Sequence, residues 1–189
     1  TGEISAGLAE ADRAIEVDRL APLGGFVREW CLYMGRRYDD VIAWRTSSGA
    51  RDQTFLYVDT FLGAAYREQD RYHEALEEYR RAQGYAGELP LYGYAITYAR
   101  MGKAAEAQEM LARLKNFARS HYVNPLFAAA VHAALGENDQ AFEWIERAVT
   151  DRTVLAAGLS FWPEFDVLHA DPRFAALVRR VGLPSGKAK

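Results

Sequence analysis

Apolar residues recur along most of this chain at intervals of three and four, the spacing that gathers them on one face of a helix. In three segments a small residue is followed three positions later by a large one: Gly63 and Tyr66, Ala95 and Tyr98, Ala129 and His132. Runs of β-branched residues that alternate with polar ones, the pattern of a strand, do not occur. The sequence therefore predicts an all-α protein.

The helical pattern repeats at a nearly constant interval. Residues 36–42 and 70–76 match in register at an offset of 34, and further copies begin at residues 2, 102 and 136. One equivalent position is Gly or Ala in four of the five copies: Gly7, Val41, Ala75, Ala107 and Ala141. Two antiparallel helices approach closely only where neither carries bulk. The interval therefore predicts nested helical hairpins, each with a leading and a rear helix.

The prolines agree with this division. Pro22, Pro90 and Pro125 each fall in the predicted first turn of a leading helix. At that point the missing N–H is not needed and the fixed φ favours the helix. We therefore expect the leading helices to begin near these residues.

The third copy, Phe61-Leu62-Gly63-Ala64-Ala65-Tyr66 followed by residues 71–82, resembles the tetratricopeptide repeat, whose unit is a 34-residue helix-turn-helix. The resemblance extends over residues 1 to about 150. It implies a right-handed solenoid of antiparallel helix-turn-helix repeats over residues 1–152, with about four and a half repeats, the first truncated.

The second copy departs most from the repeat pattern. It has Glu29 where a small residue is usual, and Arg45 and Ser48 where the rear helix expects packing residues. We therefore expect its rear helix to be short or irregular near residues 46–49.

The tail, residues 153–189, breaks the period and is rich in aromatic residues. It resembles the ending that follows such repeats in bacterial multidomain signalling and regulatory proteins. A solenoid must cover the exposed face of its last hairpin, and we expect six residues to do so: Phe161, Trp162, Phe165, Leu168, Phe174 and Leu177. Asp171 and Pro172 predict the N-cap and first residue of a closing helix that Gly182 ends, before a flexible tail. The alternative is that the aromatic cluster forms a ligand pocket.

Composition and charge exclude several partners. The chain has 23 Lys and Arg against 26 Asp and Glu, a net charge of −3, so it has no general basic field for nucleic acid. The longest apolar stretch is shorter than the ~20 residues that span a bilayer, so we expect no membrane contact. A single cysteine, Cys31, fits a reducing compartment, and cytoplasm is the default. The chain begins at Thr1 in what looks like the middle of a hairpin, so we expect it to be a piece of a longer protein.

Motifs of catalysis, cofactor binding and metal binding are not found. The segments that come nearest to a phosphate-binding loop and to a nucleophile elbow each fail at a decisive position. The four histidines lack the spacing of zinc ligands: His73, His121, His132 and His169. We expect His132 to pack, His73 to lie on an outer polar face, and Cys31 to be a buried small hydrophobe. Carboxylate pairs such as Glu77-Glu78 are adjacent in predicted helices and are expected to be solvated surface. The chain is therefore expected to be no enzyme and to bind no cofactor or metal.

In tetratricopeptide repeats the leading helices line a concave groove, and the resemblance carries this role to particular positions here. The implied lining is rich in aromatic residues and arginine: Phe26, Trp30, Tyr33, Tyr57, Thr60, Arg67, Tyr92, Ile96, Arg100, Leu126 and Ala130. Such side chains often anchor an amphipathic helix or an extended peptide. The alternative is that several of these rings pack between neighbouring repeats.

The sequence thus favours a scaffold that binds a protein, a peptide or a neighbouring domain of the same polypeptide, in a bacterial signalling or regulatory protein. Two rival functions stay open. One is a homodimerisation module that uses the aromatic groove or the incompletely covered first hairpin. The other is a small-ligand sensor that controls an attached output domain.

Overall fold

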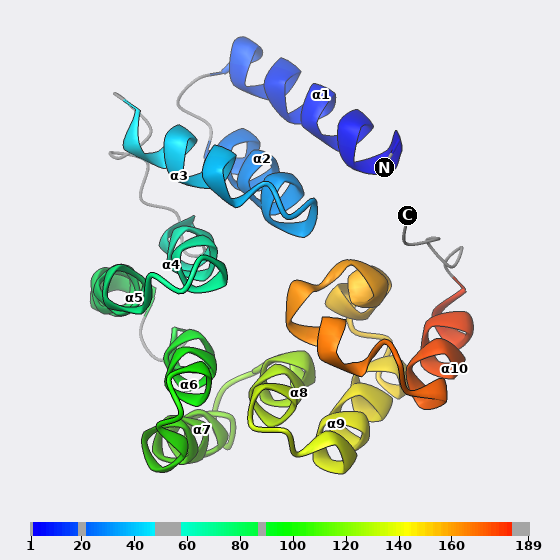
Figure 1. Ribbon diagram of the computed structural model, residues 1–189. Helices are drawn as coiled ribbons and strands as arrows, with labels where there is room; N and C mark the ends of the chain where they lie inside the picture. The colour runs from blue at the N-terminus through cyan, green and yellow to red at the C-terminus, as the bar shows by residue number, and fades with distance from the viewer. Residues whose placement is uncertain (1, 19–21, 48–57, 87–89, 183–189) are drawn as a thin grey trace. The chain divides into compact units, whose positions relative to one another are not determined.

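The computed structural model describes residues 2–18, 22–47, 58–86 and 90–182 (Figure 1). In these ranges the chain is helical and contains no strand, so the all-α prediction is confirmed. The helices of the N-terminal half are α1 (Gly2–Val17), α2 (Pro22–Met34), α3 (Tyr38–Thr46), α4 (Val58–Glu68) and α5 (Tyr72–Ala86). They are followed by α6 (Leu91–Arg100), α7 (Ala104–Phe117), α8 (Pro125–Ala134), α9 (Asn138–Thr150), the 3-10 helices η1 (Val154–Phe161) and η2 (Pro163–Leu168), and α10 (Pro172–Val181).

The chain forms two compact units, Thr1–Gly93 and Tyr94–Lys189. In unit 1, α1 packs on α2, α2 on both α3 and α4, and α4 on α5. In unit 2, α7 packs on α8, α8 on α9 and η2, and α9 on α10 and η1. The predicted division between an array and a cap at residue 152 falls between α9 and η1 and stays a prediction.

The same turn closes four successive helix pairs, from α2–α3 to α8–α9. Each leading helix is followed by a residue with positive φ: Arg36 at 59°, Asp70 at 58°, Gly102 at 75° and Gly136 at 76°. The next residue donates its N–H, at 2.9 Å, to the carbonyl five positions back: Arg37 to Leu32, Arg71 to Tyr66, Lys103 to Tyr98, and Glu137 to His132. This is the Schellman arrangement, which satisfies the last carbonyls of a helix. The turns are spaced 34, 32 and 34 residues apart, the same intervals that separate the small residues from Val41 onward.

The small residues lie where the helices crowd together, as predicted. Ala75, Ala95 and Ala107 are completely buried. A Cβ atom built on Gly63 would lie only 2.6 Å from Cε1 of Tyr79, which covers this point of α4 from α5. The register inferred from the sequence is therefore confirmed at these positions.

The starts of the leading helices also follow the prediction. Pro22 and Pro125 are the first residues of α2 and α8, and Pro90 directly precedes α6. Asn124 caps α8 by accepting a hydrogen bond from the backbone N–H of Leu126 at 3.0 Å.

The irregular second copy has a specific explanation. Its rear helix, α3, has only nine residues and ends at Thr46, while Ser48 and Gly49 lie outside the described residues. Glu29 and Arg45 form an ion pair at 3.3 Å, with 1% and 4% of their side chains exposed. Two of the three departures from the repeat pattern, Glu29 and Arg45, therefore occupy one buried site and neutralise each other.

The tail packs on the last hairpin of unit 2. Five of the six residues expected to cover that hairpin are buried, and Phe161 is half-buried. The ring of Trp162 lies 6.3 Å from that of Phe127 in α8, and Phe165 lies 5.8 Å from Trp162. These rings pack against one another and against α8, as expected of a cap, while the alternative of a ligand pocket among them stays a prediction.

The closing helix α10 begins and ends as predicted. Asp171 accepts a hydrogen bond from the backbone N–H of Arg173 at 2.9 Å, Pro172 follows as first residue, and Gly182 ends the helix with φ of 79°. The expected flexible tail after Gly182 lies outside the described residues.

Candidate functional site

Unit 1 contains a buried cluster of arginine and tyrosine that joins three helices. The Arg67 guanidinium of α4 donates hydrogen bonds to the hydroxyl of Tyr33 in α2 at 2.7 Å and to the hydroxyl of Tyr79 in α5 at 3.3 Å. It also forms an ion pair with Glu68 at 3.0 Å, and none of its side chain is exposed. A buried arginine needs such partners because an unpaired buried charge is costly. The cluster therefore fixes α2, α4 and α5 to one another.

Several residues that were expected to line the groove are buried in this packing. Tyr33, Thr60 and Arg67 are buried within unit 1, and the Tyr33 ring packs against Phe61 at 5.7 Å. Their side chains are occupied by neighbouring helices, so for them the alternative of packing between helices applies. The expectation that they line an accessible groove does not fit these positions.

Two aromatic residues of α2 are placed differently. Phe26 and Trp30 are half-buried, and the ring of Phe26 lies 5.7 Å from that of Phe61 in α4. They are one α-helical turn apart, so they share one face of α2. This half-exposed aromatic face is the part of unit 1 that fits the expected binding role. Tyr57 lies outside the described residues.

Helix α6 carries a row of half-buried tyrosines. Tyr92 is half-buried and Arg100 is exposed, as a binding role requires, whereas Ile96 is buried. Tyr94 and Tyr98 stack on each other at 6.4 Å, and both are half-buried. Tyr98 was expected only as the large residue that follows Ala95, and Tyr94 was not singled out. The signal for both was the four-residue spacing of two tyrosines on one helix.

The expected groove residues of α8 are not accessible. Leu126 and Ala130 are completely buried. Every residue of α8 from Pro125 to Ala133 is buried, because the helix lies between α7, α9 and η2. A helix that is covered on so many sides has no free face to offer a partner at these positions.

Unit 2 has a polar network around His132 of α8. The Nδ1 atom of His132 lies 2.5 Å from Oε2 of Glu137, and its Nε2 atom lies 3.2 Å from Nζ of Lys115 in α7. Gln108 donates to the other oxygen of Glu137 at 2.7 Å. Because a lysine ammonium can only donate, Nε2 is the acceptor and Nδ1 carries the proton that Glu137 accepts. His132 is buried, as expected, and ties α7 to the turn between α8 and α9.

Two further groups that could carry chemistry lie in the described residues: the Ser120–His121 pair and the thiol of Cys31. Ser120 Oγ lies 3.0 Å from Nδ1 of His121, but both are exposed in a turn and the His121 ring stacks on Phe117 at 4.0 Å. Cys31 is half-buried, and burial raises the pKa of its thiol, which disfavours a reactive thiolate. No group of His, Cys, Asp and Glu in the described ranges could hold a metal ion.

One expectation about charged surface residues needs correction. Glu77 is exposed, but Glu78 is buried and accepts a hydrogen bond from Arg81 at 2.8 Å. Adjacent residues on a helix point in different directions, so one of the pair faces the neighbouring structure while the other faces solvent.

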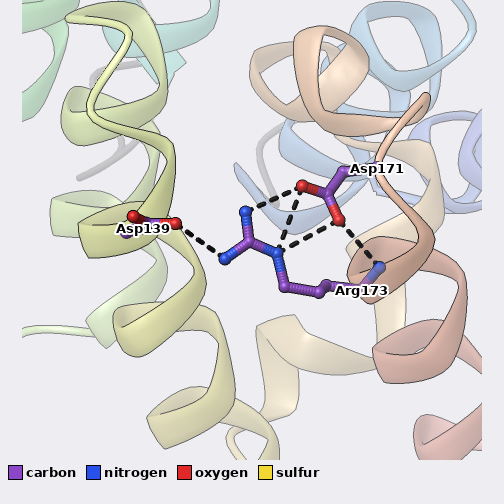
Figure 2. A network of polar contacts seen from close by, with 3 residues as sticks. All are labelled: Asp139, Asp171 and Arg173. Atoms are coloured by element: carbon purple, nitrogen blue, oxygen red, sulfur yellow. Dashed lines mark hydrogen bonds and ion pairs between the residues drawn. The ribbon is translucent and has the colours of Figure 1, made fainter.

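Charged residues also hold the closing helix against α9. Figure 2 shows the Arg173 guanidinium between Asp171 and Asp139, at 2.7 Å from an oxygen of each. The same guanidinium lies 4.1 Å from the ring centroid of Phe142. Hydrogen bonds from Arg173 lower the pKa of the Asp171 carboxyl group, since they favour its charged form.

A second ion pair joins the same two helices. Arg180 contacts both oxygens of Glu146, at 2.5 and 2.6 Å. Asp139 and Arg173 are 34 residues apart, and so are Glu146 and Arg180. The tail was expected to break the period, yet α10 meets α9 with charged partners at the repeat interval. This offset between opposite charges was visible in the sequence and was missed.

Comparison with known proteins adds no identification: no protein-family model matches the chain, and searches of curated proteins and of solved structures find no match either. The resemblance to the tetratricopeptide repeat therefore stays a prediction. Across the described ranges, the helices are too short or too polar to cross a bilayer.

Proposed function

We propose that this chain is a tetratricopeptide-like solenoid that acts as a non-catalytic scaffold for a protein, a peptide or a domain of its own polypeptide. The observation that carries the proposal is the shared interval of turns and small residues. Schellman turns recur at spacings of 34, 32 and 34 residues, and completely buried Val41, Ala75, Ala107 and Ala141 follow each by five. Units built to one period stack into arrays whose surfaces serve for docking.

The proposed contact residues are the expected groove residues that keep solvent access. Phe26, Trp30 and Tyr92 are half-buried, and Arg100 is exposed. Aromatic rings and arginine bury much surface with few rotatable bonds, so they anchor many interfaces. An amphipathic or extended peptide with apolar side chains suits such residues.

The polar clusters support a scaffold more than an enzyme. Arg67 is hydrogen-bonded to two tyrosines and paired with a glutamate, and His132 is hydrogen-bonded to a glutamate and a lysine. Each cluster ties helices together. We therefore place the chain in the interaction part of a larger regulatory protein, and in the cytoplasm on the ground of its single cysteine.

The test is selection of peptides from a displayed random library with the full chain, followed by binding measurements on variants. Trp30→Ala should weaken the selected peptides at least tenfold, since a buried aromatic anchor contributes about 2 kcal/mol or more. Trp44→Ala is the matched control, because it removes the same side chain from the rear helix α3. Unfolding curves of both variants establish that they fold.

A library that yields no binder would count against the scaffold. So would peptides that bind the two tryptophan variants equally well. If Trp30→Ala does not fold, peptide binding by Phe26→Ser tests the same face of α2.

A further inference from the structure

Unit 2 contains a hollow of about 400 Å³ where α9 ends, η1 begins and α10 ends. Its apolar wall consists of Val149, Ala156, Ala157 and Val181, and its polar part of Arg152, Thr153 and Arg180. The volume lies at the lower end of the range of about 300–1,000 Å³ that is usual for ligand sites. None of the aromatic residues of the tail lines it, so it is separate from the packed cluster that covers α8.

Arg152 occupies an unfavourable backbone conformation at the edge of this hollow. Its φ is 50°, a left-handed value at which an L side chain is sterically penalised. At two comparable turns the chain has Gly102 and Gly136. The other arginine in such a position, Arg36, donates a hydrogen bond to the carbonyl of Met34 at 2.9 Å. The guanidinium of Arg152, by contrast, has no hydrogen-bond or ion-pair partner among the residues that the structure describes.

Thr153 supplies a second unused polar group at the same place. Its Oγ1 atom is buried and has no hydrogen-bond partner, although Thr153 is the N-cap residue of η1. Buried hydroxyl groups in folded proteins are nearly always paired with protein, water or a ligand. Arg152 and Thr153 are adjacent in the chain and line the same hollow.

The charges of the hollow limit the ligand. Arg180 is already neutralised by Glu146, whose two oxygens lie 2.5 and 2.6 Å from it. Arg152 is therefore the one uncompensated charge in the lining. Arg152 is exposed, and its single positive charge matches a singly charged carboxylate, which can accept charge-assisted hydrogen bonds from a guanidinium. The valine and alanine wall matches a short aliphatic chain.

We propose that this hollow binds a small aliphatic carboxylate, with Arg152 and Thr153 holding the carboxylate and the apolar wall holding the chain. The ligand is a free short-chain acid or the C-terminus of a peptide that ends in a small aliphatic residue, since both present the same chemistry. The site is independent of the proposed scaffold surface, which lies on other helices.

The test is an NMR titration of the full chain with pentanoate, followed at the backbone amides of Thr153, Ala156 and Ala157. Pentanamide is the matched probe, because it has the same length without the charge. Saturable shifts are expected with pentanoate, and shifts that saturate only at roughly tenfold higher concentration with pentanamide, since a charge-assisted hydrogen bond is lost. A tripeptide acid, acetyl-Ala-Ala-Val, is titrated in parallel. Its tighter binding would assign the site to peptide C-termini, and its weaker binding to free acids.

Two glycine substitutions separate binding from folding. Arg152→Gly removes the guanidinium and also relieves the left-handed backbone, so the variant folds while its pentanoate affinity falls about tenfold or more. Arg36→Gly gives the same backbone relief in unit 1 and should leave pentanoate binding unchanged. The proposal is overturned by equal affinities of wild type and Arg152→Gly. Equal shifts with pentanoate and pentanamide, or no shifts at about 50 mM, well above the millimolar Kd expected of so small a ligand, would overturn it as well.

Discussion

Gly63→Ala tests the close helix approach on which the repeat depends. A Cβ atom at residue 63 would lie 2.6 Å from Cε1 of Tyr79 and 2.9 Å from two other ring atoms. Carbon atoms prefer a separation of about 3.5–4.0 Å, so the ring would have to shift by about 1 Å. The ring has little room, because a Cβ on Gly93 would also lie 2.6 Å from Cε1, and the Tyr79 hydroxyl accepts a hydrogen bond from Arg67.

Two opposing effects set the size of the change. Alanine is a better helix former than glycine by about 1 kcal/mol, which favours the variant. Overpacking a tight core destabilises it by about 1–3 kcal/mol. Because Tyr79 is only 1% exposed and is confined on two sides, we expect overpacking to dominate. The free energy of unfolding should fall by about 1–2 kcal/mol.

The assay is urea unfolding of the wild type, Gly63→Ala, Tyr79→Leu and the double variant. Leucine removes the ring and therefore the collision, so Gly63→Ala should become stabilising by up to about 1 kcal/mol in the Tyr79→Leu background. A change of sign between the two backgrounds is the signature of the clash. The clash with Tyr79 is refuted if Gly63→Ala stabilises the wild type, or if the two substitutions act additively.

Three other predictions concern turns and charges. Gly136→Ala should lower the free energy of unfolding in urea by about 1–2 kcal/mol, because an L side chain enters a left-handed position, whereas Arg36→Gly should raise it by up to about 1 kcal/mol. Arg45→Ala should cost about 3–5 kcal/mol in the same assay, since Glu29 loses its buried arginine, while replacing Glu29 by Ala and Arg45 by Leu together should cost much less. The lowered pKa of Asp171 makes a stabilising contribution that is complete above the ordinary carboxyl pKa and is lost as the pH falls through the lowered one. Thermal unfolding followed by tryptophan fluorescence should therefore show an acid-side decline that Asp171→Asn reduces.

A specific result would contradict each of these three predictions. Equal urea midpoints for Gly136→Ala and wild type would mean that the turn does not require glycine. A double replacement of Glu29 and Arg45 as damaging as Arg45→Ala alone would contradict their pairing. An acid decline of Tm that is unchanged in Asp171→Asn would place the titrating group elsewhere.

The periodic features of the fold were predictable because they follow from local sterics. Small residues such as Ala75 and Ala107 indicate close helix contacts, and the prolines indicate where helices begin. Both signals can be recognised without knowing the distant parts of the chain. The cap was predictable for the same reason, since Asp171, Pro172 and Gly182 are local signals. The left-handed turn at Arg36 was not, because arginine does not signal that conformation.

The candidate site was less predictable, because accessibility depends on which neighbours a side chain meets. Arg67 was expected to line the groove, and only the fold reveals the hydroxyl groups of Tyr33 and Tyr79 beside it. Glu29 and Arg45 were each recognised as unusual, but their pairing joins residues 16 positions apart in different helices. The polar hollow near Arg152 had no sequence motif, since it forms where three separate helices end or begin.

Two arginines with positive φ, Arg36 and Arg152, allow stability and ligand binding to be changed separately. Glycine at residue 36 relieves the strained backbone and removes the hydrogen bond from Arg36 to the carbonyl of Met34, so it is a candidate for engineering a more stable protein. Glycine at residue 152 brings the same relief but erases the positive charge of the hollow. The chain can therefore be stabilised at residue 36 without a change in the hollow. At residue 152 the same stabilisation removes the arginine that we propose binds the ligand.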